Sequence, residues 1–163
     1  KNYTDNSNFI VTSYMPSTTL NVISIKINDD LTLLDTPGII NDGDINTHID
    51  EDLVKLINIK HEIKPRVFQA KDNTSIIIDK IGRINILNES NISIYISNNI
   101  DVDRVNYNSN NEYKDLEVTK IKVKKDEDLV IEGLCFIKVS ETTAFEIYMK
   151  DGIDIYKRDK FIG

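Results

Sequence analysis

Hydrophobic and polar residues alternate regularly in the first patterned segment of the chain. Isoleucines occupy every second position from 23 to 27, with polar residues between them, and this period of two predicts a half-buried β-strand. Asn28-Asp29-Asp30 then supplies turn residues, and the apolar run Leu31–Leu34 follows. We therefore expect a β-hairpin whose second strand ends at Asp35 and leads directly into Thr36-Pro37-Gly38.

The spacing of apolar residues changes after a polar loop over 42–46. Asp50 can cap a helix that runs to about Lys60, with leucines and an isoleucine spaced along one side. Pro65 stops any continuation, because a proline disfavours helical backbone in the residue before it. The pattern predicts one helix between the loop and Pro65.

Short strands dominate the pattern after Pro65. They are separated by polar or glycine-containing turns and are predicted over 66–70, 75–79, 83–87, 92–97, 118–123, 129–139, 144–149 and 153–156. Asp151-Gly152 is a turn sequence that commonly joins the two strands of a hairpin. We place a domain boundary near 60–66 and predict an α/β fragment over 1–60, followed by a mostly β module over 61–163.

The amino-acid composition indicates the class of protein. The chain of 163 residues is 40% hydrophobic and 29% charged, which is typical of a folded protein. Its apolar runs are too short for a membrane span, and the polar start lacks a signal-peptide core, so we expect a cytoplasmic protein without a membrane partner. The single cysteine, Cys135, lies in an apolar run and is expected to be a buried packing thiol.

The net charge of −7 is distributed unevenly along the chain. Residues 1–50 contain two lysines and seven aspartates, whereas 60–100 contains six lysines or arginines against four acidic residues. Binding to a phosphate backbone depends on cations that displace counterions. Any nucleic-acid contact is therefore expected in the β module, and Arg66 and Arg83 are the predicted contact residues. Taken individually, each of them is more simply explained as an ordinary solvated residue on a strand surface.

Asp35-Thr36-Pro37-Gly38 follows the predicted hairpin directly, where P-loop nucleotide hydrolases carry their second metal-site motif. An aspartate at a strand tip can hold the Mg²⁺ shell, usually through a water molecule. A glycine lets its backbone N–H approach a γ-phosphate with no side chain in the way. Asp-x-Pro-Gly is also a common turn after a strand, so the tetrapeptide alone leaves both interpretations open.

Two threonines, Thr18 and Thr19, precede the hairpin. A GTPase needs a switch threonine that coordinates Mg²⁺ and senses the γ-phosphate, placed before the strand that pairs with the aspartate strand. The order of threonines, strand, turn, strand and Asp-x-x-Gly meets this requirement, with Thr19 and Asp35 at the metal and Thr18 as the alternative switch threonine. Threonine also favours strands, so the pair can instead mark the start of one.

Four regions carry longer motifs in a fixed order along the chain. They are Thr12–Leu20, Asp35–Asn41, Glu62–Gln69, and Glu132–Leu134 together with Lys150–Ile155. In this order the chain resembles the C-terminal part of the YqeH-type circularly permuted GTPases, which have Asp-Thr-Pro-Gly-Ile-Ile-Asn at the second region. Ser17 stands where that family has a glycine, and Cys135-Phe136 stands where it has Gly-Trp.

The resemblance implies a GTPase in which the phosphate-binding loop precedes the switch motifs. Residues 1–60 would then be a partial P-loop GTPase domain, and 61–163 a β-rich module that binds RNA or protein. That loop, the base-specifying motif and a cysteine zinc finger would then lie upstream of Lys1. GTP or GDP with Mg²⁺ would be bound in the intact parent through Thr18, Thr19, Asp35, Thr36, Pro37 and Gly38. The chain alone, without the phosphate loop, is expected to be inactive and to carry no catalytic residue of its own.

The family assists assembly of the small ribosomal subunit, so the resemblance implies that subunit or its RNA as the partner. Its C-terminal β module resembles a tryptophan-regulated RNA-binding fold. A rival hypothesis from another class treats this chain as a non-enzymatic module that binds RNA or a ribosomal protein through its β domain. The phosphate loop distinguishes the two hypotheses. A chain without that loop is not a self-sufficient nucleotide hydrolase.

Overall fold

Antiparallel strand pairing accounts for most of the described backbone. The structure is a computed structural model and describes residues 23–26, 31–35, 41–71, 73–108 and 112–161. It divides into two units, Lys1–Asn41 and Asp42–Gly163. The helix predicted from the sequence belongs to the second unit, so this division lies about twenty residues before the boundary that the sequence suggested.

In the first unit, the described residues form the predicted hairpin. β1 (Ile23–Lys26) pairs with β2 (Thr32–Asp35) in an antiparallel register that sets Ile23 opposite Asp35. Alternating isoleucines and a polar turn were therefore sufficient to identify both strands and their pairing. Asp35 is the last residue of β2, as the sequence predicted.

The second unit begins with a 3₁₀ turn, η1 (Ile45–Thr47), and the helix α1 (Glu51–Ile57). Asp50 is the N-cap residue of α1, and Val54 and Ile57 are buried. The helix ends before the predicted Lys60, and Ile59 is 60% exposed. Helices in proteins are stabilised mainly by burying an apolar face, so a further turn without buried residues gains little.

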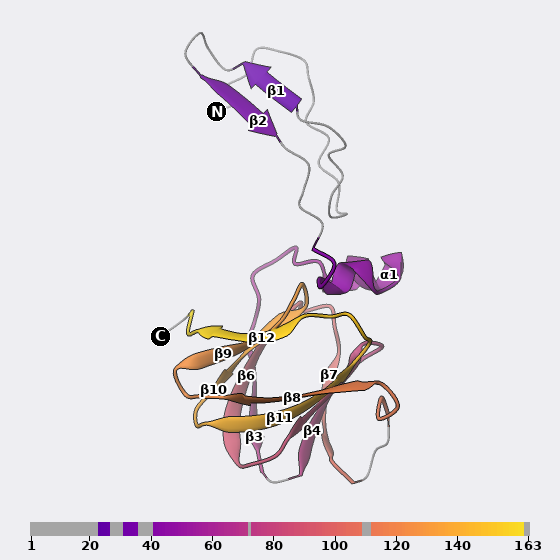
Figure 1. The fold of residues 1–163 in the computed structure, drawn as a ribbon, viewed down its shortest axis with the longest axis vertical. Coiled ribbons are helices and arrows are strands. Elements are labelled where there is room, and N and C mark those ends of the chain that lie inside the picture. Colours follow the sequence, from indigo (N-terminus) through magenta and orange to yellow (C-terminus); the bar gives the residue numbers. More distant parts are fainter. Residues whose placement is uncertain (1–22, 27–30, 36–40, 72, 109–111, 162–163) are drawn as a thin grey trace. The chain divides into compact units, whose positions relative to one another are not determined.

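Ten strands follow α1 within the described residues. They are β3 (Arg66–Ala70), β4 (Thr74–Ile78), β5 (Gly82–Ile86), β6 (Ser90–Ile96), β7 (Val102–Asn106), β8 (Glu117–Val123), β9 (Glu127–Ile131), β10 (Cys135–Val139), β11 (Thr143–Met149) and β12 (Ile155–Asp159). Sheet I has the strand order β12-β9-β10-β6-β3, and sheet II has the order β7-β4-β5-β11-β8. Figure 1 shows these strands gathered around one interior, with α1 at one end.

The two sheets share a single hydrophobic core. It contains Ile92, Ile94 and Ile96 of β6 from sheet I, together with Phe145 and Ile147 of β11 from sheet II. β6, β10 and β11 alternate between buried and half-exposed residues, as strands with one face on a core should. In β4 and β5, by contrast, every residue is buried, so the outer face of sheet II is covered over these two strands.

The predicted α/β class for residues 1–60 is wrong. The described part of this segment holds a two-stranded antiparallel sheet and, as its only α-helix, the seven residues of α1. An α/β layer needs strands covered by helices that are long enough to bury a face. The described chain is instead mostly β.

Three strand predictions also need correction. The apolar run 129–139 forms two strands, β9 and β10, because Gly133 at φ +73° allows a tight turn between them. β7 was not predicted, since its sequence Val-Asp-Arg-Val-Asn is short and polar. Asp151-Gly152 is a turn, but β11 and β12 lie in different sheets and do not form the predicted hairpin.

Candidate functional site

The predicted nucleotide residues lie at or beyond the end of the first hairpin. Asp35 is at the tip of β2, paired with the first residue of β1. Thr18, Thr19, Thr36, Pro37 and Gly38 lie outside the described residues. The order of strand, turn, strand and aspartate is thus present, and the metal and phosphate roles of these residues stay predictions.

The segment that follows this motif packs on two glycine turns of the second unit. The N–H of Ile45 donates to the carbonyl of Glu132 at 3.1 Å, and the N–H of Asp154 donates to the carbonyl of Gly43 at 2.8 Å. A Cβ atom on Gly133 would collide with the carboxylate of Asp44. Two motifs that carried the resemblance, Glu132–Leu134 and Lys150–Ile155, therefore have a structural role: they hold the chain that leads out of Asp35–Asn41.

Arg83 lies at the centre of a buried polar cluster on the outer face of sheet II. Its side chain has no exposed surface, and burial lowers the pKa of the guanidinium. Nε donates to Oδ1 of Asn85 at 2.6 Å, while Nη2 donates to Oγ of Ser75 at 2.8 Å and to the carbonyl of Tyr107 at 2.9 Å. The ring of Tyr107 also lies against the guanidinium, 5.5 Å from its centroid.

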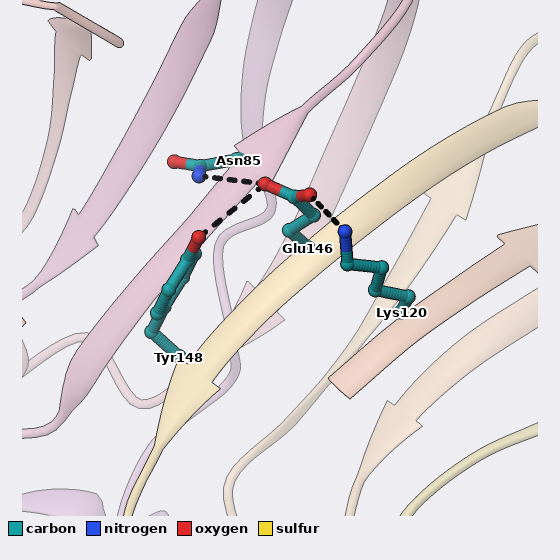
Figure 2. A network of polar contacts seen from close by, with 4 residues as sticks. All are labelled: Asn85, Lys120, Glu146 and Tyr148. Carbon is teal, nitrogen blue, oxygen red and sulfur yellow. Dashed lines mark hydrogen bonds and ion pairs between the residues drawn. The ribbon is translucent and has the colours of Figure 1, made fainter. Parts of the chain in front are cut away.

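Glu146 extends the same cluster across the sheet. Figure 2 shows one carboxylate oxygen facing Asn85 and Tyr148 and the other facing Lys120. The Nζ atom of Lys120 lies 2.9 Å from Oε1, and the other two contacts are longer, at 3.4 Å each. The hydrogen bond from Lys120 is the main cause that lowers the pKa of Glu146, and burial raises the pKa of Tyr148.

Described residues on either side of 109–111, between β7 and β8, contact this side of the sheet. The carbonyl of Tyr107 accepts from Arg83, and the hydroxyl of Tyr113 accepts from the N–H of Lys80 at 2.9 Å. Arg83 therefore fastens a connection to the sheet, and its predicted role as a surface contact needs correction. A guanidinium without exposed surface cannot reach a phosphate, and polar alternation alone could not reveal that the position was covered.

Arg66, the other predicted contact residue, is half-buried at the start of the edge strand β3. Its Nη2 atom donates to the carbonyl of Asn98 at 3.3 Å. Arg66 and Arg83 thus lie on different sheets and face different surroundings. The structure does not bring them together into one contact surface.

An aromatic cluster lies on the outer face of sheet I. Tyr95 of β6 and Phe136 of β10 are opposite each other in the strand register, and their rings stack with centroids 4.4 Å apart and planes 6° apart. The guanidinium of Arg158 on β12 lies 5.1 Å from the ring centroids of both Phe136 and Phe161. The ring of Phe161 meets Phe136 edge-on, with a centroid distance of 6.5 Å, and Phe161 is 73% exposed. We call Tyr95, Phe136, Arg158 and Phe161 the aromatic ladder.

Charged groups of both signs lie beside the aromatic ladder. Asp128 of β9 is fully buried and accepts the N–H of Phe161 at 3.0 Å. In the strand register Asp128 lies opposite Lys138 of β10 and Arg158 of β12, and both of these side chains are half-buried. The hydroxyl of Tyr156 on β12 donates to the carboxylate of Glu132 at 2.6 Å.

A separate polar cavity of about 210 Å³ lies beside the turn at Asp151. Glu117 and Asp151 form part of its lining, and a hydrogen bond between the two carboxyl groups raises the pKa of Glu117. Among the described residues, no group of three or more histidines, cysteines or acidic residues is arranged to hold a metal ion. Asp154 also lines the cavity, but it is not grouped with this pair closely enough to hold a metal ion.

Two further predictions concern Cys135 and membrane-spanning segments. The thiol is buried, as predicted, and burial raises its pKa to about 12, which makes it a poor nucleophile. Within the residues that the structure describes, none of the helical segments has the length and apolar character needed to cross a bilayer.

Comparison with known proteins identified a relative of this chain. No protein-family model matches the chain. The chain is similar to the uncharacterized protein YqeH of Bacillus subtilis (strain 168), with 35% identity over 83 residues. The aligned region is 51% of this chain and 23% of that relative, so the match spans less than a quarter of the relative's length. The similarity to YqeH that the motifs indicated is thus found over half of the chain.

Proposed function

We propose that the chain is the C-terminal portion of a GTP-binding protein that resembles YqeH and assists assembly of the small ribosomal subunit. The observation that carries this proposal is the register of the first hairpin. β2 ends at Asp35, directly before Thr36-Pro37-Gly38, and its partner β1 follows the two threonines in sequence. The similarity to YqeH supports the same assignment.

Residues of the first unit would hold the nucleotide in the intact parent protein. The hydroxyl of Thr19 and the carboxylate of Asp35 offer oxygen ligands, which Mg²⁺ prefers, and Thr18 is the alternative to Thr19. The backbone of Gly38, with Thr36 and Pro37 beside it, would approach the γ-phosphate. Bound Mg²⁺ would neutralise charge on the β- and γ-phosphates.

A charge-conserving test of this proposal uses the full-length parent and a fluorescent GTP or GDP analogue. Asp35→Asn removes the carboxylate charge but keeps the size of the side chain. It is expected to weaken Mg²⁺-dependent GTP binding by about tenfold or more, and GDP binding by less, because the γ-phosphate shares the metal. Asp52→Asn is the matched control, because this carboxylate is exposed on α1 and forms an ion pair with Lys55, far along the chain from the motif.

Equal GTP affinity in Asp35→Asn and wild type would contradict the metal role of Asp35 and favour the plain turn. A weakened GTP affinity in Asp52→Asn would show that the effect is not specific to the motif. Magnesium-dependent GTP hydrolysis by chain 1–163 alone, abolished by Asp35→Asn, would contradict the proposed need for an upstream phosphate loop.

The second unit would make the contact with the small ribosomal subunit or its RNA. Residues 1–50, with two lysines and seven aspartates, carry most of the negative charge of the chain and should repel RNA. The rest of the chain is much closer to neutral. The non-enzymatic hypothesis, a module that binds RNA or a ribosomal protein, describes what this chain does on its own. It is tested by retention of chain 1–163 on purified small subunits at low salt, and failure to bind would contradict it.

A further inference from the structure

We propose that the edge strand β3 of sheet I pairs with β3 of a second copy of the chain, so that two molecules share one continuous antiparallel sheet. The inference goes beyond the proposed function and does not depend on it. It gives a role to the motif Glu62–Gln69, which includes most of β3 and has no part in the proposed nucleotide site.

The hydrogen bonds of the neighbouring strand β6 show which backbone groups of β3 face outward. The N–H of Asn91 donates to Oγ of Ser140, and its carbonyl accepts from the N–H of Ser140, so both groups point towards β10. Backbone groups alternate in direction along a strand, so those of Ile92 point towards β3, where Ile92 lies opposite Phe68. The residues before and after Phe68 therefore turn their N–H and carbonyl groups away from β6.

These two residues, Val67 and Gln69, lie on the open side of β3. The described residues place no strand beyond β3 in sheet I. Val67 is 66% exposed, and Gln69 is exposed as well. The carbonyl of Gln69 accepts from Nη1 of Arg104 in sheet II at 3.2 Å, which agrees with its outward direction and leaves a second lone pair for another donor. The edge thus offers backbone hydrogen bonds to a further strand.

Symmetry and charge select a second copy as that partner. When a twofold axis passes through the centre of an antiparallel pair, the central residue lies opposite its own copy, and like charges in this position are destabilising. The other edge strands described in the two sheets have Lys157 (β12), Arg104 (β7) and Lys120 (β8) at their centres. β3 has Phe68 there, so self-pairing brings two aromatic side chains together instead.

The outward groups also determine the register of the pair. With the twofold axis beside Phe68, Val67 of one copy lies opposite Gln69 of the other, and each turns its backbone groups towards its partner. Arg66 lies opposite Ala70 and meets no like charge. A pair of such short strands buries less area than an obligate interface does, so the dimer should be weak and should form as the concentration rises.

Sedimentation equilibrium of chain 1–163 over about 5–500 µM measures this dimer directly. Wild type should change from monomer towards dimer within this range. Val67→Pro is expected to raise Kd by about tenfold or more, because it removes an N–H that bonds only to the partner, at an edge position where proline is tolerated. Val67→Thr is the matched control, because it keeps the β-branched shape and the N–H, and its Kd should stay within about threefold of wild type. Urea unfolding establishes that both variants are folded.

Disulfide formation tests the register independently. The two Phe68 positions would form a non-hydrogen-bonded pair with Cα atoms about 4.5 Å apart, which a disulfide can bridge. Phe68→Cys should therefore give a cross-linked dimer under mild oxidation. Gln69→Cys is the control, because its two copies would be more than about 7 Å apart, too far for a disulfide. Cys135 is buried and should not contribute.

A wild-type chain that stays monomeric at the highest concentration would overturn the proposal. A dimer whose Kd is the same in Val67→Pro would place the interface elsewhere and would also overturn it. Equal cross-linking of Phe68→Cys and Gln69→Cys would contradict the twofold register on which the choice of a second copy depends. None of these outcomes affects the GTP-binding test with Asp35→Asn, which concerns the first unit.

Discussion

The two sheets of the second unit use polar and aromatic residues on their outer faces in opposite ways. On sheet II, Arg83 is fully buried and donates to Asn85, Ser75 and the carbonyl of Tyr107. On sheet I, Arg158 lies against the half-buried Phe136 and the exposed Phe161, and its buried Nε atom has no hydrogen-bond partner within the described residues. One arginine is stabilised by hydrogen bonds, and the other by contacts with aromatic rings.

The difference shows how two arginines on the outer faces of sheets are stabilised by different kinds of contact. Buried polar groups in folded proteins are almost always hydrogen-bonded, because an unpaired group loses its solvation without compensation. The cluster around Arg83 follows this rule, since its polar side chains hydrogen-bond to one another. Arg158 instead packs its guanidinium between two aromatic rings and leaves its buried Nε atom unpaired within the described residues.

The largest expected effect concerns the stability of the two arginine sites. Arg83→Met removes the buried donors, leaves the carbonyl of Tyr107 without its partner and releases the connection between β7 and β8. We expect the free energy of unfolding to fall by about 2–4 kcal/mol. Arg158→Met keeps apolar contact with the rings and should cost less than about 1 kcal/mol.

The free energies of unfolding of both arginine variants are compared from their urea midpoints, analysed with a common m-value. Equal losses in the two would contradict the distinction between the sheets. A neutral Arg83→Met would show that the apolar replacement compensates for the buried polar cluster, as happens at some buried ion pairs.

An intermediate effect concerns the stacked pair on sheet I. A double-mutant cycle on Tyr95→Ala and Phe136→Ala should give a coupling energy of about 0.5–1.5 kcal/mol, because the rings stack in direct contact. A cycle that combines Phe136→Ala with Tyr148→Ala, on the other sheet, should be additive within about 0.5 kcal/mol. Coupling of the same size in both cycles would mean that the variants act through global unfolding rather than through the stack.

The smallest effect is the pH dependence contributed by Glu146. Lys120 holds the pKa of this carboxyl below its ordinary value, so the native state binds its proton less readily than the unfolded chain. The stabilisation is therefore complete above the unfolded pKa of about 4.3 and is lost as the pH falls through the lower folded pKa. Because the side chain of Lys120 is 71% exposed, we expect less than about 1 kcal/mol.

The measurement compares urea midpoints at about pH 6 and pH 3 in wild type and in Glu146→Gln. Wild type should lose more stability between these values than the variant does. Lys120→Met should also flatten the profile, whereas Lys122→Met, two residues away on the same strand, should leave it unchanged. A profile in Glu146→Gln identical to that of wild type would remove Glu146 from the groups that titrate on this face.

Several local features of the chain followed from its sequence alone. Alternation of isoleucine with polar residues predicted the β1–β2 hairpin, and β3 was predicted with the bounds that it has. The burial of Cys135 followed from its apolar run. These features depend on a few neighbouring residues, and a period of two marks both a strand and its buried face. The similarity to YqeH could likewise be inferred from the order of short motifs in the sequence.

Tertiary structure decided which strands pair and which polar residues are covered. β11 and β12 are separated by a turn sequence typical of hairpins, yet they join different sheets, because alternation specifies a face and not a partner. Arg83 alternates with apolar neighbours like a solvated residue and is buried by Tyr107, 24 positions away. Tyr95 and Phe136, 41 positions apart, stack only because β6 and β10 are neighbours in sheet I. Contacts between distant positions depend on the whole arrangement of strands, which no local pattern contains.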